Sequence, residues 1–123
     1  RRHLRSRGRL QRPADLRDIH YLTPDERTAL ADVAVGMKLS TWRYRWDTAG
    51  APLHLGFLID DHEGSYAVTA DGERVDLYGY TSLVLATVQV QERRIDALEA
   101  RLAAQDAELA ELRARLMVPV AGR

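Results

Sequence analysis

The sequence predicts an α+β fold: a short helix and a small antiparallel sheet, followed by a long C-terminal helix that forms a parallel coiled coil. Two observations predict it. Apolar residues in the middle of the chain alternate with a period of two, and those of the last third recur with a heptad period. With 123 residues, 46% of them apolar, the chain is large enough for one domain with its own core.

Composition excludes several classes of function. The chain has no cysteine, which excludes disulfide scaffolds, thiol catalysis and zinc–thiolate sites. No apolar run approaches the roughly 18 residues of a membrane-spanning helix, so we expect no membrane partner. No signal peptide is visible and the chain begins with Arg1 instead of Met, so we expect it to be a piece of a longer protein.

Charge divides the chain unevenly. Residues 1–12 contain six arginines and no acidic residue, whereas the rest of the chain carries a net charge of −6. We expect a basic arm over residues 1–15, a globular head over 16–80, a coiled-coil helix over 81–117 and a tail over 118–123. No aromatic residue interleaves with the arginines, and no recognition helix that could contact bases follows them. We therefore expect a linker or processing segment and no nucleic-acid partner.

The head begins with a helix-start signal. Thr23 can cap, Pro24 suits the first helical position, and Glu26 stands three residues after the cap, where a capping box needs it. Leu30, Val33 and Met37 then recur at helical spacing, which predicts a helix of roughly three turns.

Two strands follow the helix. Between Leu39 and Trp46, residues Trp42, Tyr44 and Trp46 alternate with polar ones, which predicts a half-buried strand. After a turn, a second strand has an apolar side formed by Leu53, Leu55, Phe57 and Ile59. We expect the core of the head to contain Trp42, Trp46 and Phe57.

A hairpin is predicted at Asp71-Gly72, the residue pair that a two-residue type I′ turn requires. In that register Val68 pairs with Val75 and Tyr66 with Leu77, which places apolar side chains together on one face.

From Thr81 to Met117 there is no Gly or Pro, and Pro119 and Gly122 end the helix. Five heptads keep one frame, which predicts a left-handed coiled coil roughly 55 Å long. Thr81 opens the series at position a. The predicted interface then consists of Val84, Val88, Gln91, Ile95, Leu98, Leu102, Gln105, Leu109, Leu112 and Leu116.

The residues that flank this stripe favour parallel chains. In a parallel assembly each g residue faces the e residue of the next heptad on the neighbouring chain, and all three charged pairs are opposite in sign: Arg94–Glu99, Arg101–Asp106 and Glu108–Arg113. The heptads leave two and three strands open. An antiparallel pair of helices within one chain is the alternative, but no second helix of sufficient length is predicted.

Signatures of cofactor or metal chemistry are absent from the sequence. There is no glycine-rich phosphate loop, nucleophile elbow or H-E-x-x-H helix, and we expect no cofactor. The run Asp60-Asp61-His62-Glu63 has metal-binding residue types, but successive side chains at a strand end diverge, so we expect a solvated turn and no metal. We expect His20 and His54 to be isolated surface or half-buried side chains.

The order of features from Trp42 onward resembles the C-terminal intramolecular chaperone domain of phage tailspikes and tail fibres, the peptidase S74 family. The segments that carry the resemblance are TWRYRWD, LHLGFLIDD and GERVDLYGYTSLVLATVQVQERRIDALEARL. Ile59-Asp60-Asp61 stands where the family often has Ala-Gln-Glu. The resemblance implies a homotrimer that aligns the chains of an upstream fibre during folding, on a virion tail fibre or in the host cytoplasm during assembly.

In this family a motif Ser-Asp-x-Arg-x-Lys cleaves the chain before its serine, with the lysine as base. Ser6 and Arg9 match that motif, but Arg7 replaces the aspartate and Gln11 stands in the lysine position. Because an amide does not act as a base, we expect self-cleavage to be lost.

Three alternatives stay open. The chain could be an active self-cleaving peptidase with Lys38, its only lysine, as the base, or a passive coiled-coil stalk in which Ser6 is an ordinary residue of the arm. A related domain also occurs in a membrane-tethered transcription factor, so the parent could be cellular instead of viral.

Overall fold

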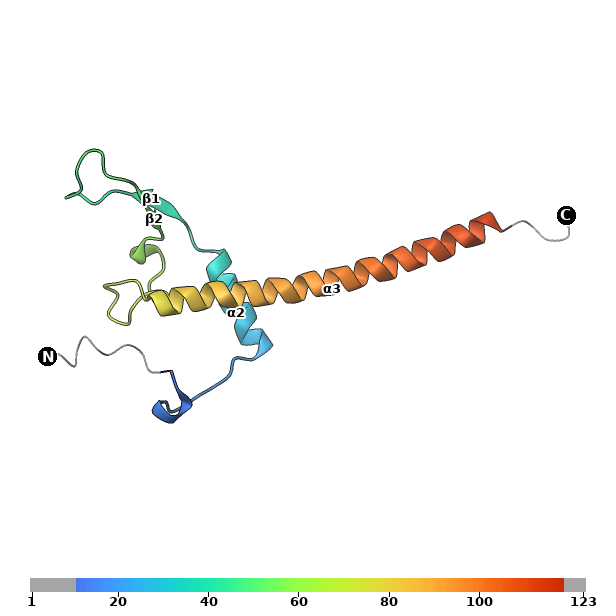
Figure 1. The fold of residues 1–123 in the computed structure, drawn as a ribbon, viewed down its shortest axis with the longest axis horizontal. Helices are drawn as coiled ribbons and strands as arrows, with labels where there is room; N and C mark the ends of the chain where they lie inside the picture. The colour runs from blue at the N-terminus through green and yellow to red at the C-terminus, as the bar shows by residue number, and fades with distance from the viewer. Residues whose placement is uncertain (1–10, 119–123) are drawn as a thin grey trace.

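The computed structural model describes residues 11–118 and consists of a small head with one long helix projecting from it (Figure 1). The α+β order is confirmed, including the small antiparallel sheet and the long C-terminal helix. The elements are η1 (Pro13–Asp15), α2 (Pro24–Val35), β1 (Ser40–Trp42), β2 (His54–Gly56), η2 (Ile59–Asp61) and α3 (Leu77–Met117).

Helix α2 begins with the predicted capping box. The Glu26 N–H donates to Thr23 Oγ1 at 3.2 Å, and the Thr23 N–H donates to Glu26 Oε1 at 2.8 Å. The helix has 12 residues, which confirms the predicted three turns, and Ala31 is its buried residue while Val33 is 43% exposed. A small side chain at residue 31 allows α2 to lie close against α3.

The sheet is shorter than predicted. Its register pairs Ser40 with Gly56 and Trp42 with His54, and no pairing continues beyond Trp42. The predicted strand over residues 39–46 is therefore wrong in its second half, because Asp47 closes a turn there. The Tyr44 N–H donates to Asp47 Oδ2 at 2.8 Å, and the Asp47 N–H donates to the Tyr44 carbonyl at 3.0 Å.

The core of the head lies between α2, α3 and the loops that connect them. Phe57, Ala67, Val68 and Leu83 are its buried members, and Tyr80 packs against them. The prediction for Phe57 is confirmed, but the prediction for Trp46 is wrong, since this side chain is 79% exposed beyond the end of β1. Trp42 is only half-buried, with its ring against Gly56.

The loop before α3 keeps the predicted register at one point. Val68 and Val75 form an isolated antiparallel bridge. The turn between them is not a type I′ turn, because Gly72 has a φ of 74° but Asp71 does not have a positive φ. The predicted Tyr66–Leu77 pair does not form, because Leu77 already begins α3.

Helix α3 begins four residues before the predicted boundary at residue 81. The Asp76 carboxylate caps it by accepting a hydrogen bond from the Gly79 N–H at 3.0 Å. Gly79 lies directly against the backbone of Tyr66, so closely that a Cβ at residue 79 would overlap the Tyr66 carbonyl oxygen. This contact anchors the first turn of α3 to the head.

Candidate oligomerisation interface

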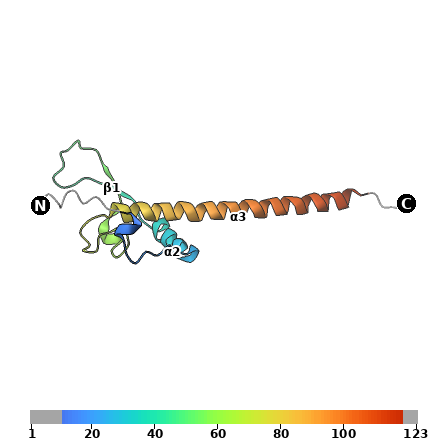
Figure 2. The same ribbon diagram turned by 60° about the horizontal axis from the view of Figure 1, so that its bottom comes forward.

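Helix α3 contacts the head along one face only. Its buried side chains are Leu83, Ala86 and Val90, which occupy heptad positions c, f and c. Helix α2 crosses α3 beside the head (Figure 1). Every residue from 91 to 118 is exposed. At 1.5 Å per residue, about 40 Å of α3 extends beyond the head without a partner among residues 11–118 (Figure 2).

The predicted a and d positions are all exposed within the described chain, Gln91 and Gln105 included. The apolar side chains of this stripe, which we call the seam, are between 47% and 84% exposed. They are Val84, Val88, Ile95, Leu98, Leu102, Leu109, Leu112 and Leu116. An apolar stripe of this length on a monomer, interrupted only by Gln91 and Gln105, marks an interaction site.

The head leaves the seam open because it covers the opposite side of α3. Around a helical heptad, positions c and f lie across from positions a and d. Helix α2 has 12 residues and packs against the c and f side, so it does not serve as the second strand of an in-chain coiled coil.

A shallow hollow on α3 has the lining of a coiled-coil hole. Leu98, Arg101, Leu102 and Gln105 surround it, which are positions d, g, a and d of the frame. In knobs-into-holes packing a side chain of one helix inserts between four residues of the facing helix. In a parallel arrangement this set of four receives the side chain at position a of the partner, which is Leu102 of a second copy.

The charged residues beside the seam make no ion pair within residues 11–118. This holds for all six members of the predicted inter-chain pairs: Arg94, Glu99, Arg101, Asp106, Glu108 and Arg113. The ion pair that α3 does contain joins Arg115 to Glu111, with the Arg115 Nη2 atom 2.7 Å from Glu111 Oε1. The six flanking charges are therefore available to a neighbouring chain.

The cleavage prediction falls mostly outside the described residues. Ser6, Arg7 and Arg9 lie there, and Gln11 is exposed at the first described position. Lys38 is exposed too, and its backbone N–H donates to His62 Nε2 at 3.2 Å. The loss of self-cleavage stays a prediction.

In the run Asp60-Asp61-His62-Glu63 after β2, His62 makes structural contacts within the head. His62 accepts the hydrogen bond from Lys38 and meets the Phe57 ring edge-on, with 5.6 Å between ring centroids. Among residues 11–118, no three His, Asp or Glu side chains gather as they would around a metal ion. No helix in the same range combines the length and apolarity needed to cross a bilayer.

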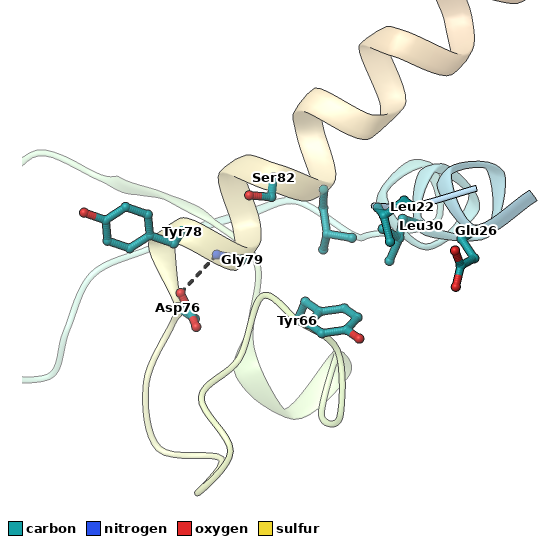
Figure 3. A pocket seen from close by; sticks show the side chains of 9 residues that line it. Leu22, Glu26, Leu30, Tyr66, Asp76, Tyr78, Gly79 and Ser82 are labelled. Carbon is teal, nitrogen blue, oxygen red and sulfur yellow. Dashed lines mark hydrogen bonds between the residues drawn. The ribbon is translucent and has the colours of Figure 1, made fainter. Parts of the chain in front are cut away.

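A cavity of about 590 Å³ lies between α2 and the start of α3 (Figure 3). Leu22, Leu30, Leu83 and Tyr66 supply much of its lining, and the Glu26 carboxylate stands at its rim. That carboxylate is engaged by the Thr23 N–H and by His20, which together hold the pKa of Glu26 below its ordinary value. The polar group that Glu26 contributes to this cavity is therefore already part of the N-terminal cap of α2.

Trp46, which was expected in the core, lies instead among aromatic rings on the surface of the β1–β2 hairpin. Tyr44 and Trp46 stack with centroids 4.7 Å apart and planes 7° from parallel. His54 lies 4.9 Å from Tyr44 between ring centroids and contacts Asp47 Oδ2 through its Nε2 at 3.1 Å. The period-two pattern placed Tyr44 and Trp46 on one face, but it predicted neither the turn at Asp47 nor the contacts of His54, which was expected to be isolated.

Comparison of the chain with protein-family models, with curated proteins and with solved structures finds no match in any of the three. The resemblance described from the sequence therefore remains an expectation, and the geometry of α3 carries the functional argument.

Proposed function

We propose that this chain is a homo-oligomerisation domain, in which three copies associate in parallel through the seam of α3. The observation that carries the proposal is the exposure of the seam along the whole helix, on the side opposite the head. Burial of such side chains contributes about 1.5–3 kcal/mol each, so eight aliphatic positions per chain supply a large driving force.

Parallel alignment is supported by the charges and by the position of the head. Three g–e′ pairs of opposite sign form only when the chains run in the same direction and in register. All heads then lie at one end of the assembly, where the preceding segments of the chains enter together. The heptads favour neither two nor three strands, and the resemblance to tail-fibre chaperone domains favours three.

The resemblance to tail-fibre chaperone domains also suggests what the association is for. The domain acts as an intramolecular chaperone of an upstream phage tail fibre or tailspike, present on the virion or in the host cytoplasm during assembly. Chains that must wind together lose entropy when they are aligned, and a parallel coiled coil lowers that loss by raising the local concentration of partners. Self-cleavage is lost in this proposal, because Gln11 occupies the position of the base.

Sedimentation equilibrium over a range of concentrations tests the association. We expect about 42 kDa, three times the 13.9 kDa of one chain. Leu102→Asp places a charge in the seam and is expected to release 13.9 kDa monomers. The control is Ala103→Asp, the neighbouring residue outside the seam, which is expected to stay trimeric. A wild-type chain that is monomeric at every concentration contradicts the proposal.

Two further experiments use the longer parent protein. Deleting residues 81–123 is expected to leave aggregated or monomeric fibre, whereas a passive stalk predicts a fibre that still forms but is less stable. With the natural upstream sequence present, the chain is expected to remain uncut before Ser6. A cut that Ser6→Ala abolishes contradicts the loss of self-cleavage.

A further inference from the structure

The seam changes character where α3 lies beside the head. Leu85 occupies an e position next to the seam and is 55% exposed. The later e positions are all charged, namely Glu92, Glu99, Asp106 and Arg113. The apolar surface is therefore three positions wide near the head and two positions wide farther along. A coiled-coil seam needs only a and d, so the additional leucine beside it offers apolar surface for a further contact.

The other flank of the same segment is occupied by the head itself. Tyr80 stands at position g and packs against the core, with its ring edge-on to Phe57 and 5.0 Å between centroids. The buried residues Leu83 and Ala86 continue this side of the helix. Each copy thus has a head on the g flank of its helix and an open apolar e flank.

We propose that Leu85 of each copy packs against Tyr80 of the neighbouring copy, so that the interface extends from the coiled coil into the head. The inference rests on the parallel association proposed above. In that arrangement the g residue at 80 faces the e residue at 85 of the next chain, by the same offset that pairs Arg94 with Glu99. This g–e′ pair is apolar, whereas the three charged pairs farther along α3 are ionic.

The contact couples association to the folding of the head. Phe57 is 4% exposed, and its cluster has three other buried members within residues 11–118, namely Ala67, Val68 and Leu83, which is small for an independent unit. Tyr80 rests on Phe57, so a neighbour's Leu85 that covers Tyr80 shields the edge of this core from water. Trp42 and Trp46 both lie in the head, so their fluorescence reports on its folding separately from the mass.

Leu85→Glu tests the contact without altering the in-chain core, because Leu85 is exposed in the single chain. We expect the concentration for half-dissociation to rise at least about tenfold, since each chain loses an apolar contact. Head unfolding, followed by tryptophan fluorescence, is expected at lower temperature. Gln89→Glu adds the same charge one turn later at an exposed b position and is expected to change neither measurement.

A second test uses the absence of cysteine from the chain. Tyr80→Cys combined with Leu85→Cys is expected to give disulfide-linked dimers and trimers on oxidation. Residues five apart on one helix lie on different faces, so the bond forms only between chains. Ser82→Cys combined with Gln89→Cys is the control, with both positions on the outer b side, and is expected to stay unlinked.

The outcomes separate this inference from the proposed function. A monomeric wild-type chain overturns both. A trimeric wild-type chain whose mass and head stability are unaffected by Leu85→Glu, and whose paired cysteines do not link the chains, overturns the head contact and leaves the coiled coil in place.

Discussion

At the scale of single residues, Gly79 decides how the long helix joins the head. Glycine is usually unfavourable in a helix, and Gly79→Ala in isolation would favour helix formation by about 1 kcal/mol. In this chain the added Cβ would overlap the carbonyl oxygen of Tyr66, which is backbone and cannot rotate away. We therefore expect a net destabilisation of about 1–3 kcal/mol, measured by denaturant unfolding with tryptophan fluorescence.

Gly50→Ala is the matched control for this substitution. Gly50 lies in the turn between β1 and β2, and a Cβ there would meet no atom within 4 Å. We expect it to leave the free energy of unfolding nearly unchanged. If both variants unfold alike, the close approach between Gly79 and Tyr66 does not limit the stability of the head.

At the scale of elements, the cap of α2 predicts how the head responds to acid. The Thr23 backbone N–H, then His20, lower the pKa of Glu26 from its ordinary value of 4.5. A carboxylate with a lowered folded pKa stabilises the helix above pH 4.5 and loses that contribution as the pH falls through the folded value. We expect the start of α2 to loosen in that window, followed by NMR of the Glu26 and Thr23 amides.

Glu26→Gln keeps the side chain able to accept from Thr23 but removes its titration. Its α2 amide shifts are expected to stay constant over the same acidic window. Asp71 provides an internal comparison, because hydrogen bonds from the Thr69 hydroxyl and the Glu73 N–H, neither of which belongs to α2, lower its pKa. If α2 loosens equally in Glu26→Gln, another group controls its response to acid.

The elements also differ in how far the sequence could predict them. The capping box and the heptads are local patterns whose signals lie within a few residues. The capping box formed and a long helix formed over the heptads, while the coiled coil stays a prediction. The head depends on contacts between distant segments, such as Phe57 with Tyr80, which no local period contains. The alternation through Trp46 predicted a long strand, but the hydrogen bond from the Tyr44 N–H to Asp47 ended it. The sequence predicted the residues of the seam. It did not predict the contact proposed for Leu85, because that contact depends on which side of α3 the head covers.

At the scale of the whole molecule, the direction and register of the chains can be tested through one charge pair. Arg101 and Asp106 are predicted to face each other between neighbouring copies, and the residues three and four positions from each of them are uncharged. Neither side chain therefore has an ionic neighbour on its own helix. A change at either position acts on the contact between chains.

We expect Arg101→Glu and Asp106→Arg to weaken association separately, because each places like charges together three times in a trimer. Combined in one chain, the two changes restore opposite charges with their signs exchanged, and the stability of the assembly should return close to that of the wild type. Because an exposed pair contributes at most about 1 kcal/mol, the midpoint of thermal dissociation at low salt is the sensitive measurement. Recovery is specific to parallel chains in register. A double variant weaker than both single variants would place like charges opposite one another and require a different alignment of the helices.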